Sequence, residues 1–286
     1  MKNFHHGKWF LEFMPDDGGR ISVLSYDGID ILCRRPDAFS APQKDYGLYE
    51  TRPVYGYDDC FPSVDACKFP SGLKWNVPDH GELCWLKWDC GELKNRLEFK
   101  ASSKVLPIVF TRRMLFSENV LTWDFEVQNN GQASIPFLHV MHPLMPLNAV
   151  TGLELPGSLS VFDEVNKREI TLPDQMPFAE YLLSLHKGTF SMFILRNISS
   201  GRMSFSLKKG LKVDIEFPGN IFPCLGIWWN NSEYPDEDGR RRCECALEPL
   251  PGYSSSLDEC IREGHFMTAS PEASLKWKII WTLKEF

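Results

Sequence analysis

The sequence predicts an all-β protein built as one large antiparallel β-sandwich. Three observations support this class: apolar and polar side chains alternate with a period of two, turn sequences recur, and helical periodicity is scarce. The strand patterns extend from residue 20 to residue 283 without a linker or a change of composition. We therefore expect one domain that spans residues 1–286.

The expected elements follow in chain order. Residues 35–80 contain six prolines and are expected to be a loop-rich segment that builds a site. Four segments alternate clearly and are expected to be half-buried strands: 121–127 (LTWDFEV), 203–207 (MSFSL), 211–217 (LKVDIEF) and 275–283 (LKWKIIWTL). Turns are expected at DDGG (16–19), NNGQ (129–132), KKG (208–210) and DEDG (236–239), and one short helix at FAEYLLSLH (178–186).

Composition narrows the classes of partner. The chain has 31 Lys and Arg against 38 Asp and Glu, a net charge of −7, which offers no attraction to nucleic acid or to an anionic membrane. No window approaches 18 apolar residues, and the first residues lack the apolar core of a signal peptide. The nine cysteines show no CxxC pair and no standard zinc spacing, so we expect reduced thiols in a cytoplasmic protein. The expected core is large enough for the chain to fold without a partner, so we expect a monomer or a weak homodimer.

Two histidines, His139 and His142, lie three residues apart in the apolar stretch LHVMHPLMP. Residues three apart on a strand point to opposite faces, and Pro143 argues against a helix. The two side chains should therefore not share a site, which argues against a metal centre made by this pair. Taken alone, either histidine would be favoured to have a core or surface role.

Two further motifs contain titratable side chains next to residues that restrict or free the backbone. His80 precedes Gly81 in PDHGELCW, and glycine permits close approach of backbone or ligand. Glu248 precedes Pro249 in CECALEPLPG, and the proline favours an extended conformation at Glu248. Taken alone, His80 could be a turn histidine and Glu248 a solvated residue at a strand end.

Taken together, the order His-Gly, His-Pro and Glu-Pro on an all-β chain resembles the galactose mutarotase-like (aldose 1-epimerase) superfamily. Further resemblance lies in GGRISVLSYDGIDIL at 18–32, in the segment from 121 to 145 that leads into His-Pro, and in CLGIWWNNSEYP before CALEPLPG. The resemblance covers nearly the whole chain. It implies the supersandwich form of the fold and a small-molecule sugar as ligand.

The resemblance also implies a set of roles. Glu248 would be the general base and His142 the general acid of sugar ring opening, and His80 would hold and polarise the sugar near its ring oxygen. This isomerase chemistry needs no metal and no redox cofactor, so neither is expected. A histidine and a carboxylate with a raised pKa suit such reversible proton transfers.

The sequence departs from the family at positions that contact the sugar. The segment YGYDDCFPSVDAC stands where the family has an Asn-Arg pair, and Leu144 and Met145 follow His-Pro where aromatics are usual. We expect Asp58 or Asp59 to accept hydrogen bonds from sugar hydroxyls and Arg52 to meet a charged group. Trp85 and Trp228 are candidates for stacking on the sugar, and strand geometry allows only one of Trp228 and Trp229 on any side. Loop and core roles remain the alternatives for all of these residues.

Three functions are therefore considered. The first is an aldose 1-epimerase-like isomerase acting on a free hexose or related sugar, and a close variant acts on a hexose 6-phosphate. That variant needs a cationic pocket, for which the candidates are Arg52, Arg112, Arg113 and the run at 239–242. A non-catalytic sugar-binding protein on the same fold is the second, because fold alone does not fix function. The third is a carbohydrate-active lyase or hydrolase.

Overall fold

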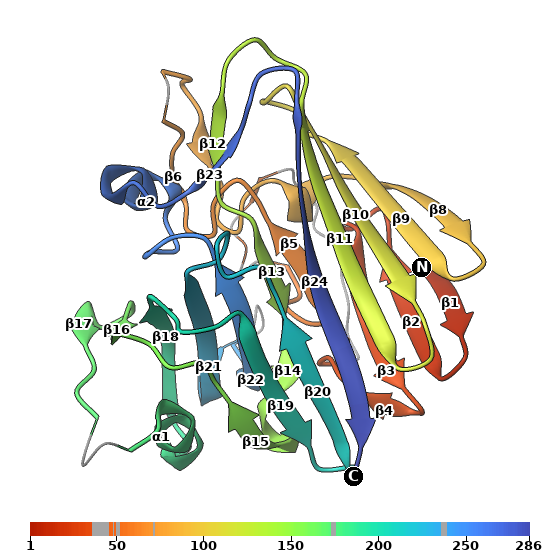
Figure 1. Cartoon of the computed structure of the whole chain (residues 1–286), viewed down its shortest axis with the longest axis vertical. Coiled ribbons are helices and arrows are strands. Elements are labelled where there is room, and N and C mark those ends of the chain that lie inside the picture. Colours follow the sequence, from red (N-terminus) through yellow and green to blue (C-terminus); the bar gives the residue numbers. More distant parts are fainter. Residues whose placement is uncertain (36–45, 48, 50–51, 71, 173–175, 236–238) are drawn as a thin grey trace.

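The computed structural model describes residues 1–35, 46–47, 49, 52–70, 72–172, 176–235 and 239–286. Its largest sheet has eight strands in the order β15-β19-β20-β24-β11-β10-β9-β8 (Figure 1). The eight strands pair in antiparallel fashion and are β8 (Asp89–Leu93), β9 (Arg96–Ser102), β10 (Ile108–Phe116), β11 (Val120–Asn129), β15 (Val150–Glu154), β19 (Arg202–Leu207), β20 (Leu211–Glu216) and β24 (Ser274–Glu285). The four strands predicted from the alternation are confirmed as β11, β19, β20 and β24.

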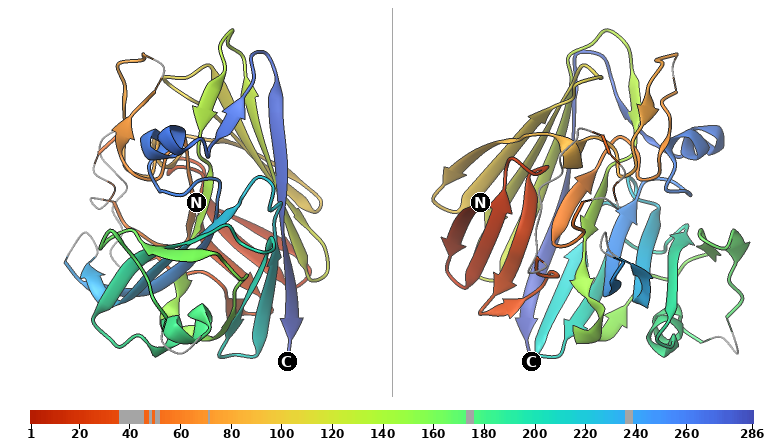
Figure 2. Two further views of the ribbon diagram at one scale, coloured as in Figure 1. Left: turned by 60° about the vertical axis from the view of Figure 1, so that its left-hand side comes forward. Right: turned by 180° about the vertical axis from the view of Figure 1, so that it is seen from behind.

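Two six-stranded sheets form the opposing layer (Figure 2). One contains β1 (Lys2–His6), β2 (Trp9–Met14), β3 (Arg20–Tyr26), β4 (Ile29–Asp30), β5 (Tyr57–Cys60) and β13 (Val140–Pro143). The other contains β14 (Met145–Pro146), β16 (Ser160–Asp163), β17 (Arg168–Glu169), β18 (Thr189–Arg196), β21 (Cys224–Pro235) and β22 (Arg241–Leu250). Because β13 runs directly into β14, which pairs with β22, one sheet continues into the other.

The core lies between the two layers. Four alternating apolar residues of β11 (Leu121, Trp123, Phe125 and Val127) are completely buried. Aromatic contacts join the layers: the rings of Tyr57 and Trp123 have centroids 4.7 Å apart, and those of Phe13 and Phe99 5.2 Å apart. The confirmed β-sandwich thus follows from alternating strands that bury one face against the opposite layer.

Shorter elements complete the described chain. Strand β12 (Ile135–Phe137) pairs with β23 (Met267–Ala269), and β6 (Cys67–Lys68) pairs with β7 (Asn76–Val77). The predicted helix is confirmed as α1 (Phe178–Ser184), whereas a second short helix, α2 (Leu257–Glu263), was not predicted. Two short 3-10 turns span Leu83–Trp85 and Leu147–Ala149. None of the helices in the described ranges is long and apolar enough to cross a membrane.

The proline-rich segment 35–80 is less irregular than expected, because it contains β5, β6 and β7. Residues 36–45, 48, 50–51 and 71 of this segment lie outside the described residues, as do 236–238 of the DEDG turn. Strand β5 is the important element, since it lies between β3 and β13 in its sheet.

Candidate functional site

Strand β5 carries two adjacent aspartates whose side chains point to opposite faces of the sheet. The carboxylate oxygen Oδ1 of Asp58 lies 3.0 Å from Nδ1 of His142, and Oδ1 of Asp59 lies 3.0 Å from Nε2 of His139. Each aspartate thus holds one histidine of the LHVMHPLMP stretch. The expectation that His139 and His142 face opposite sides is confirmed.

Asp59 and His139 lie in the core between the layers. Asp59 forms an ion pair with Arg112 of β10, and the His139 ring packs among Phe125 and Trp277. Burial by itself would raise the pKa of Asp59, but Arg112 and His139 outweigh burial and hold the pKa below its usual value. The expectation that Asp59 contacts a sugar is therefore corrected, because this carboxylate is completely buried and satisfied inside the protein.

Asp58 and His142 lie on the other face, next to a cavity. Tyr49 donates its hydroxyl hydrogen bond to Oδ2 of Asp58 over 3.0 Å, and its oxygen lies 3.3 Å from Nδ1 of His142. Burial opposes ionisation of Asp58, but the bond from His142 and the charge of Arg20 hold its pKa well below the usual range. Asp58 therefore supports His142 rather than lining the cavity, which corrects the sugar-contact role expected for it.

Glu248 projects from β22 towards His142. Its Oε1 lies 3.8 Å from Nε2 of His142, and burial raises the pKa of Glu248 to about 7. Gly226 stands opposite Glu248 in the strand register, and a Cβ at Gly226 would lie 3.4 Å from Oε2 and 2.7 Å from Met192. The missing side chain at Gly226 gives the carboxylate its space.

His80 comes from a turn in which two consecutive residues have positive φ, +59° at His80 and +69° at Gly81. A Cβ on Gly81 would lie 2.0 Å from the backbone oxygen of Phe61, so only glycine fits there. The His80 amide donates to the Val64 carbonyl over 2.6 Å. This turn packs directly against the end of β5, which brings His80 to His142.

The His80 ring is held on two sides. Tyr49 stacks on it with ring centroids 3.6 Å apart and an interplanar angle of 6°, and Nδ1 of His80 lies 3.2 Å from Oδ1 of Asp79. Burial lowers the pKa of His80, but the carboxylate of Asp79 outweighs this and raises it above its usual value. The ring is thereby fixed beside that of His142, at a centroid distance of 5.0 Å.

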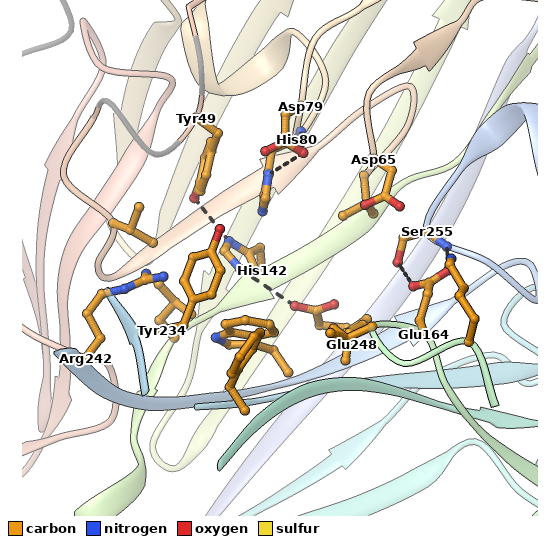
Figure 3. A pocket seen from close by; sticks show the side chains of 18 residues that line it. Tyr49, Asp65, Asp79, His80, His142, Glu164, Tyr234, Arg242, Glu248 and Ser255 are labelled. Carbon is orange, nitrogen blue, oxygen red and sulfur yellow. Dashed lines mark hydrogen bonds and ion pairs between the residues drawn. The ribbon is translucent and has the colours of Figure 1, made fainter. Parts of the chain in front are cut away.

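His80, His142 and Glu248 converge on a cavity of about 520 Å³ (Figure 3). This confirms that the three motifs, far apart in the sequence, meet in one place. Three carboxylates, two cations and four aromatic residues also line the cavity: Asp65, Asp79, Glu164, Lys167, Arg242, Tyr49, Phe190, Trp228 and Tyr234. Ser255 holds Glu164 through its amide and hydroxyl, and burial together with Glu164 raises the pKa of Asp65 to about 6.

The remaining predicted ligand contacts are divided between cavity and core. Trp228 lines the cavity, whereas Trp229 is buried on the other side, as strand geometry required. Arg52 is completely buried, where it donates to Asp17 and to the Cys84 carbonyl, and Trp85 packs over its guanidinium at 5.2 Å. The expected ligand role of Arg52 is therefore corrected, because its buried guanidinium needs these internal acceptors. The expected role of Trp85 is corrected as well, because its ring packs on that guanidinium.

Sequence reasoning missed Tyr49, Asp79 and Glu164. Asp79 directly precedes His80, and that adjacency was an available signal. Tyr49 and Glu164 gave none, because Tyr49 precedes β5 and Glu164 follows β16, far from the three motifs in the sequence.

Fold and site together define a large two-layer antiparallel β-sandwich with a cavity lined by His80, His142 and Glu248 on the outer face of one layer. The sequence matches no protein-family model and no curated protein. Similar solved structures do exist, however. The Slr1438 protein from Synechocystis sp. PCC 6803 superposes with a TM-score of 0.75 at 17% identity and covers 100% of this chain and 96% of its own.

Two further structures carry a family description. A galactose mutarotase-like protein from Clostridium acetobutylicum has a TM-score of 0.69 at 18% identity, covering 99% of this chain and 95% of its own. A galactose mutarotase related enzyme from Lactobacillus acidophilus has a TM-score of 0.62 at 16% identity, covering 99% and 97%. The chain therefore has the galactose mutarotase-like fold.

Proposed function

We propose that the protein is a cofactor-independent aldose 1-epimerase, which interconverts the α and β anomers of a hexose or related sugar. The observation that carries the proposal is the pairing of Glu248 with His142 at 3.8 Å in a cavity of about 520 Å³. One group with a pKa near 7 and one imidazole suit reversible proton transfer at neutral pH. The similar fold of a galactose mutarotase related enzyme supports the proposal.

The reaction requires one base and one acid. Glu248 removes the proton from the anomeric hydroxyl while His142 protonates the ring oxygen, so the C1–O5 bond breaks and an open-chain aldehyde forms. Rotation about C1–C2 exposes the other face of the aldehyde. The O5 hydroxyl then attacks C1, His142 takes back the proton, and Glu248 returns its proton to O1.

The surrounding residues orient and support His142 and His80 next to Glu248. Asp58 accepts from Nδ1 of His142, so Nε2 is the nitrogen that faces Glu248 and carries the transferred proton. Tyr49 binds Asp58 and stacks on His80, which ties both imidazoles to one support. His80 is placed to donate a hydrogen bond to the sugar oxygen that gains negative charge.

The cavity wall offers the contacts that a sugar needs. Asp65, Asp79 and Glu164 can accept hydrogen bonds from hydroxyl groups, and Trp228 and Phe190 offer apolar faces for C–H groups. Arg242 is the one member of the predicted arginine candidates that lines the cavity in the described chain, and it supports a hexose 6-phosphate as a second substrate class.

The proposal is tested by anomer exchange. Polarimetry and NMR saturation transfer on aldoses and hexose 6-phosphates should show accelerated exchange for at least one sugar. Glu248→Gln should lower that rate by about 10²- to 10⁴-fold, since the base is lost while the shape of the side chain is kept.

Glu126→Gln is the matched control, because this partly buried carboxylate lies on β11 in the other layer. Its rate should equal that of the wild type. Unchanged exchange for every sugar, combined with measurable sugar binding, would identify a non-catalytic binding protein instead.

A further inference from the structure

A cysteine lies beside the two histidines of the cavity. One donor atom from each of Cys60, His80 and His142 lies within 4.8 Å of the other two. The mechanism uses both imidazoles but leaves the Cys60 thiol without a role. Cys60 is almost completely buried, at 1% exposure.

The fold produces this cluster by strand register. Cys60 and Asp58 are two residues apart on β5, so they share the face on which β13 presents His142. The close approach of Gly81 to Phe61, the residue after Cys60, adds His80 from the turn. This trio differs from the pair in LHVMHPLMP, since His139 lies on the opposite face.

His142 has the outer carboxylate support that metal-binding histidines usually have, and a second carboxylate lies close to His80. Nδ1 of His142 is bound by Asp58 at 3.0 Å, and Nδ1 of His80 lies 3.2 Å from Asp79. A carboxylate on one ring nitrogen fixes the tautomer and raises the basicity of the other nitrogen. Since Asp58 occupies Nδ1 of His142, Nε2 of that ring is free to bind a metal, and the His80 ring lies beside it in the cavity (Figure 3).

We propose that Cys60, His80 and His142 form a binding site for a zinc-like divalent transition metal ion, which blocks the acid–base pair when it is bound. A set of one thiolate and two imidazoles favours such ions over Mg²⁺ and Ca²⁺, which prefer oxygen ligands. Glu248, at 3.8 Å from His142, or a water molecule supplies the fourth ligand.

The geometry requires a modest contraction. Ligand atoms around tetrahedral zinc are separated by roughly 3.3–3.8 Å, given bonds of about 2.0–2.3 Å. Small side-chain rotations of the three ligands close this gap. Binding releases the thiol proton of Cys60 to solvent. The bound metal also coordinates the His142 imidazole that would protonate the sugar, so the metal inhibits anomer exchange.

Cobalt(II) serves as the spectroscopic probe. The protein is stripped with a chelator, dialysed and titrated with Co²⁺ without oxygen. We expect one ion per chain, tetrahedral d–d bands in the visible, a sulfur-to-cobalt charge-transfer band, and displacement by Zn²⁺. Cys60→Ser should abolish the charge-transfer band and weaken Zn²⁺ binding at least tenfold.

Cys224→Ser is the matched control, since Cys224 is buried in the same apolar cluster as Cys60. It should keep the charge-transfer band and the wild-type affinity for Zn²⁺. Absence of the band in the wild type, or its persistence in Cys60→Ser, would overturn the proposal. X-ray absorption of the zinc-loaded wild type gives a check that needs no variant: a shell without sulfur would also overturn it.

Inhibition is measured separately from binding. Zn²⁺ should stop anomer exchange in the wild type and in Cys224→Ser, and a chelator should restore it. Cys60→Ser should keep the basal rate and need at least tenfold more Zn²⁺ for inhibition. If no sugar is epimerised, the cobalt and X-ray data still decide the metal site, so the two proposals fail independently.

Discussion

Glu248 shows how the protein sets the protonation of a single side chain. It is 2% exposed, and burial raises its pKa to about 7, whereas Asp58 keeps its charge because His142 and Arg20 compensate its burial. Two carboxylates next to the same imidazole thus have pKa values shifted in opposite directions. Such divergence separates a proton acceptor from a permanent anion.

A pH profile tests this assignment of Glu248. The base must be ionised, so on the acidic side kcat/KM should rise about tenfold per pH unit up to about pH 7. The measurement is kcat/KM for anomer exchange between about pH 4 and pH 8 in buffers of constant ionic strength. A rising limb centred near the ordinary glutamate value of 4.5 would contradict the role of burial.

Asp58→Asn tests the support of His142. The amide cannot balance the charge of a protonated imidazole, so kcat should fall by about 10²-fold while KM stays within about twofold. Asp65→Asn is the contrast, because Asp65 lines the cavity without contacting His142, and it should raise KM instead. A rise in KM alone for Asp58→Asn would place Asp58 among the substrate contacts.

At the level of elements, strands were predictable and the cavity wall was only partly so. The alternation in β11, β20 and β24 is encoded locally, because each strand has one face in the core. Tyr49 and Glu164 reach the cavity from irregular segments, whose course depends on the tertiary packing around them. Arg52 and Asp59 were misjudged since polar residues in a loop-like stretch read as surface, yet both neutralise charges inside the protein.

The His80–Gly81 turn gives a prediction for an element. Gly81→Ala adds a Cβ that meets the Phe61 oxygen at 2.0 Å, so the turn must move and His80 with it. We expect anomer exchange to fall at least tenfold, and stability to fall by more than the roughly 1–2 kcal/mol of left-handed strain alone. Circular dichroism melts and exchange rates measure both effects.

Gly28→Ala provides the control for strain. Gly28 also has a positive φ, +74°, but an added Cβ would meet no atom within 4 Å. Gly28→Ala should lower the free energy of unfolding only by the cost of the left-handed strain, and it should leave the rate of anomer exchange unchanged. Equal effects of both substitutions would show that the contact with Phe61 is unimportant.

At the scale of the whole molecule, one buried ion pair connects the two layers. Asp59 on β5 binds Arg112 on β10, and Arg112 also donates to the Gly19 carbonyl at the start of the β3 hairpin. The pKa of Asp59 lies below its usual value, so this stabilisation is present above about pH 4 and is lost as the pH falls.

Asp59→Asn should therefore destabilise the protein by about 3–5 kcal/mol, because the Arg112 charge stays buried without its counterion. Urea unfolding at pH 7 measures the loss. The difference from the wild type should shrink as the pH is lowered towards 3. A loss below about 1 kcal/mol would mean that His139 and Tyr57 suffice to hold this part of the core.

The adjacent aspartates of β5 have a consequence for how this protein can evolve. Asp58 serves the cavity and Asp59 serves the core, so inserting or deleting one residue in the strand would exchange their faces and remove both functions at once. A substitution at Asp58 is constrained by the cavity, and a substitution at Asp59 is constrained by the core. A change of ligand specificity is therefore expected at residues that belong to the cavity alone, such as Leu144 and Arg242, rather than within the four residues of β5.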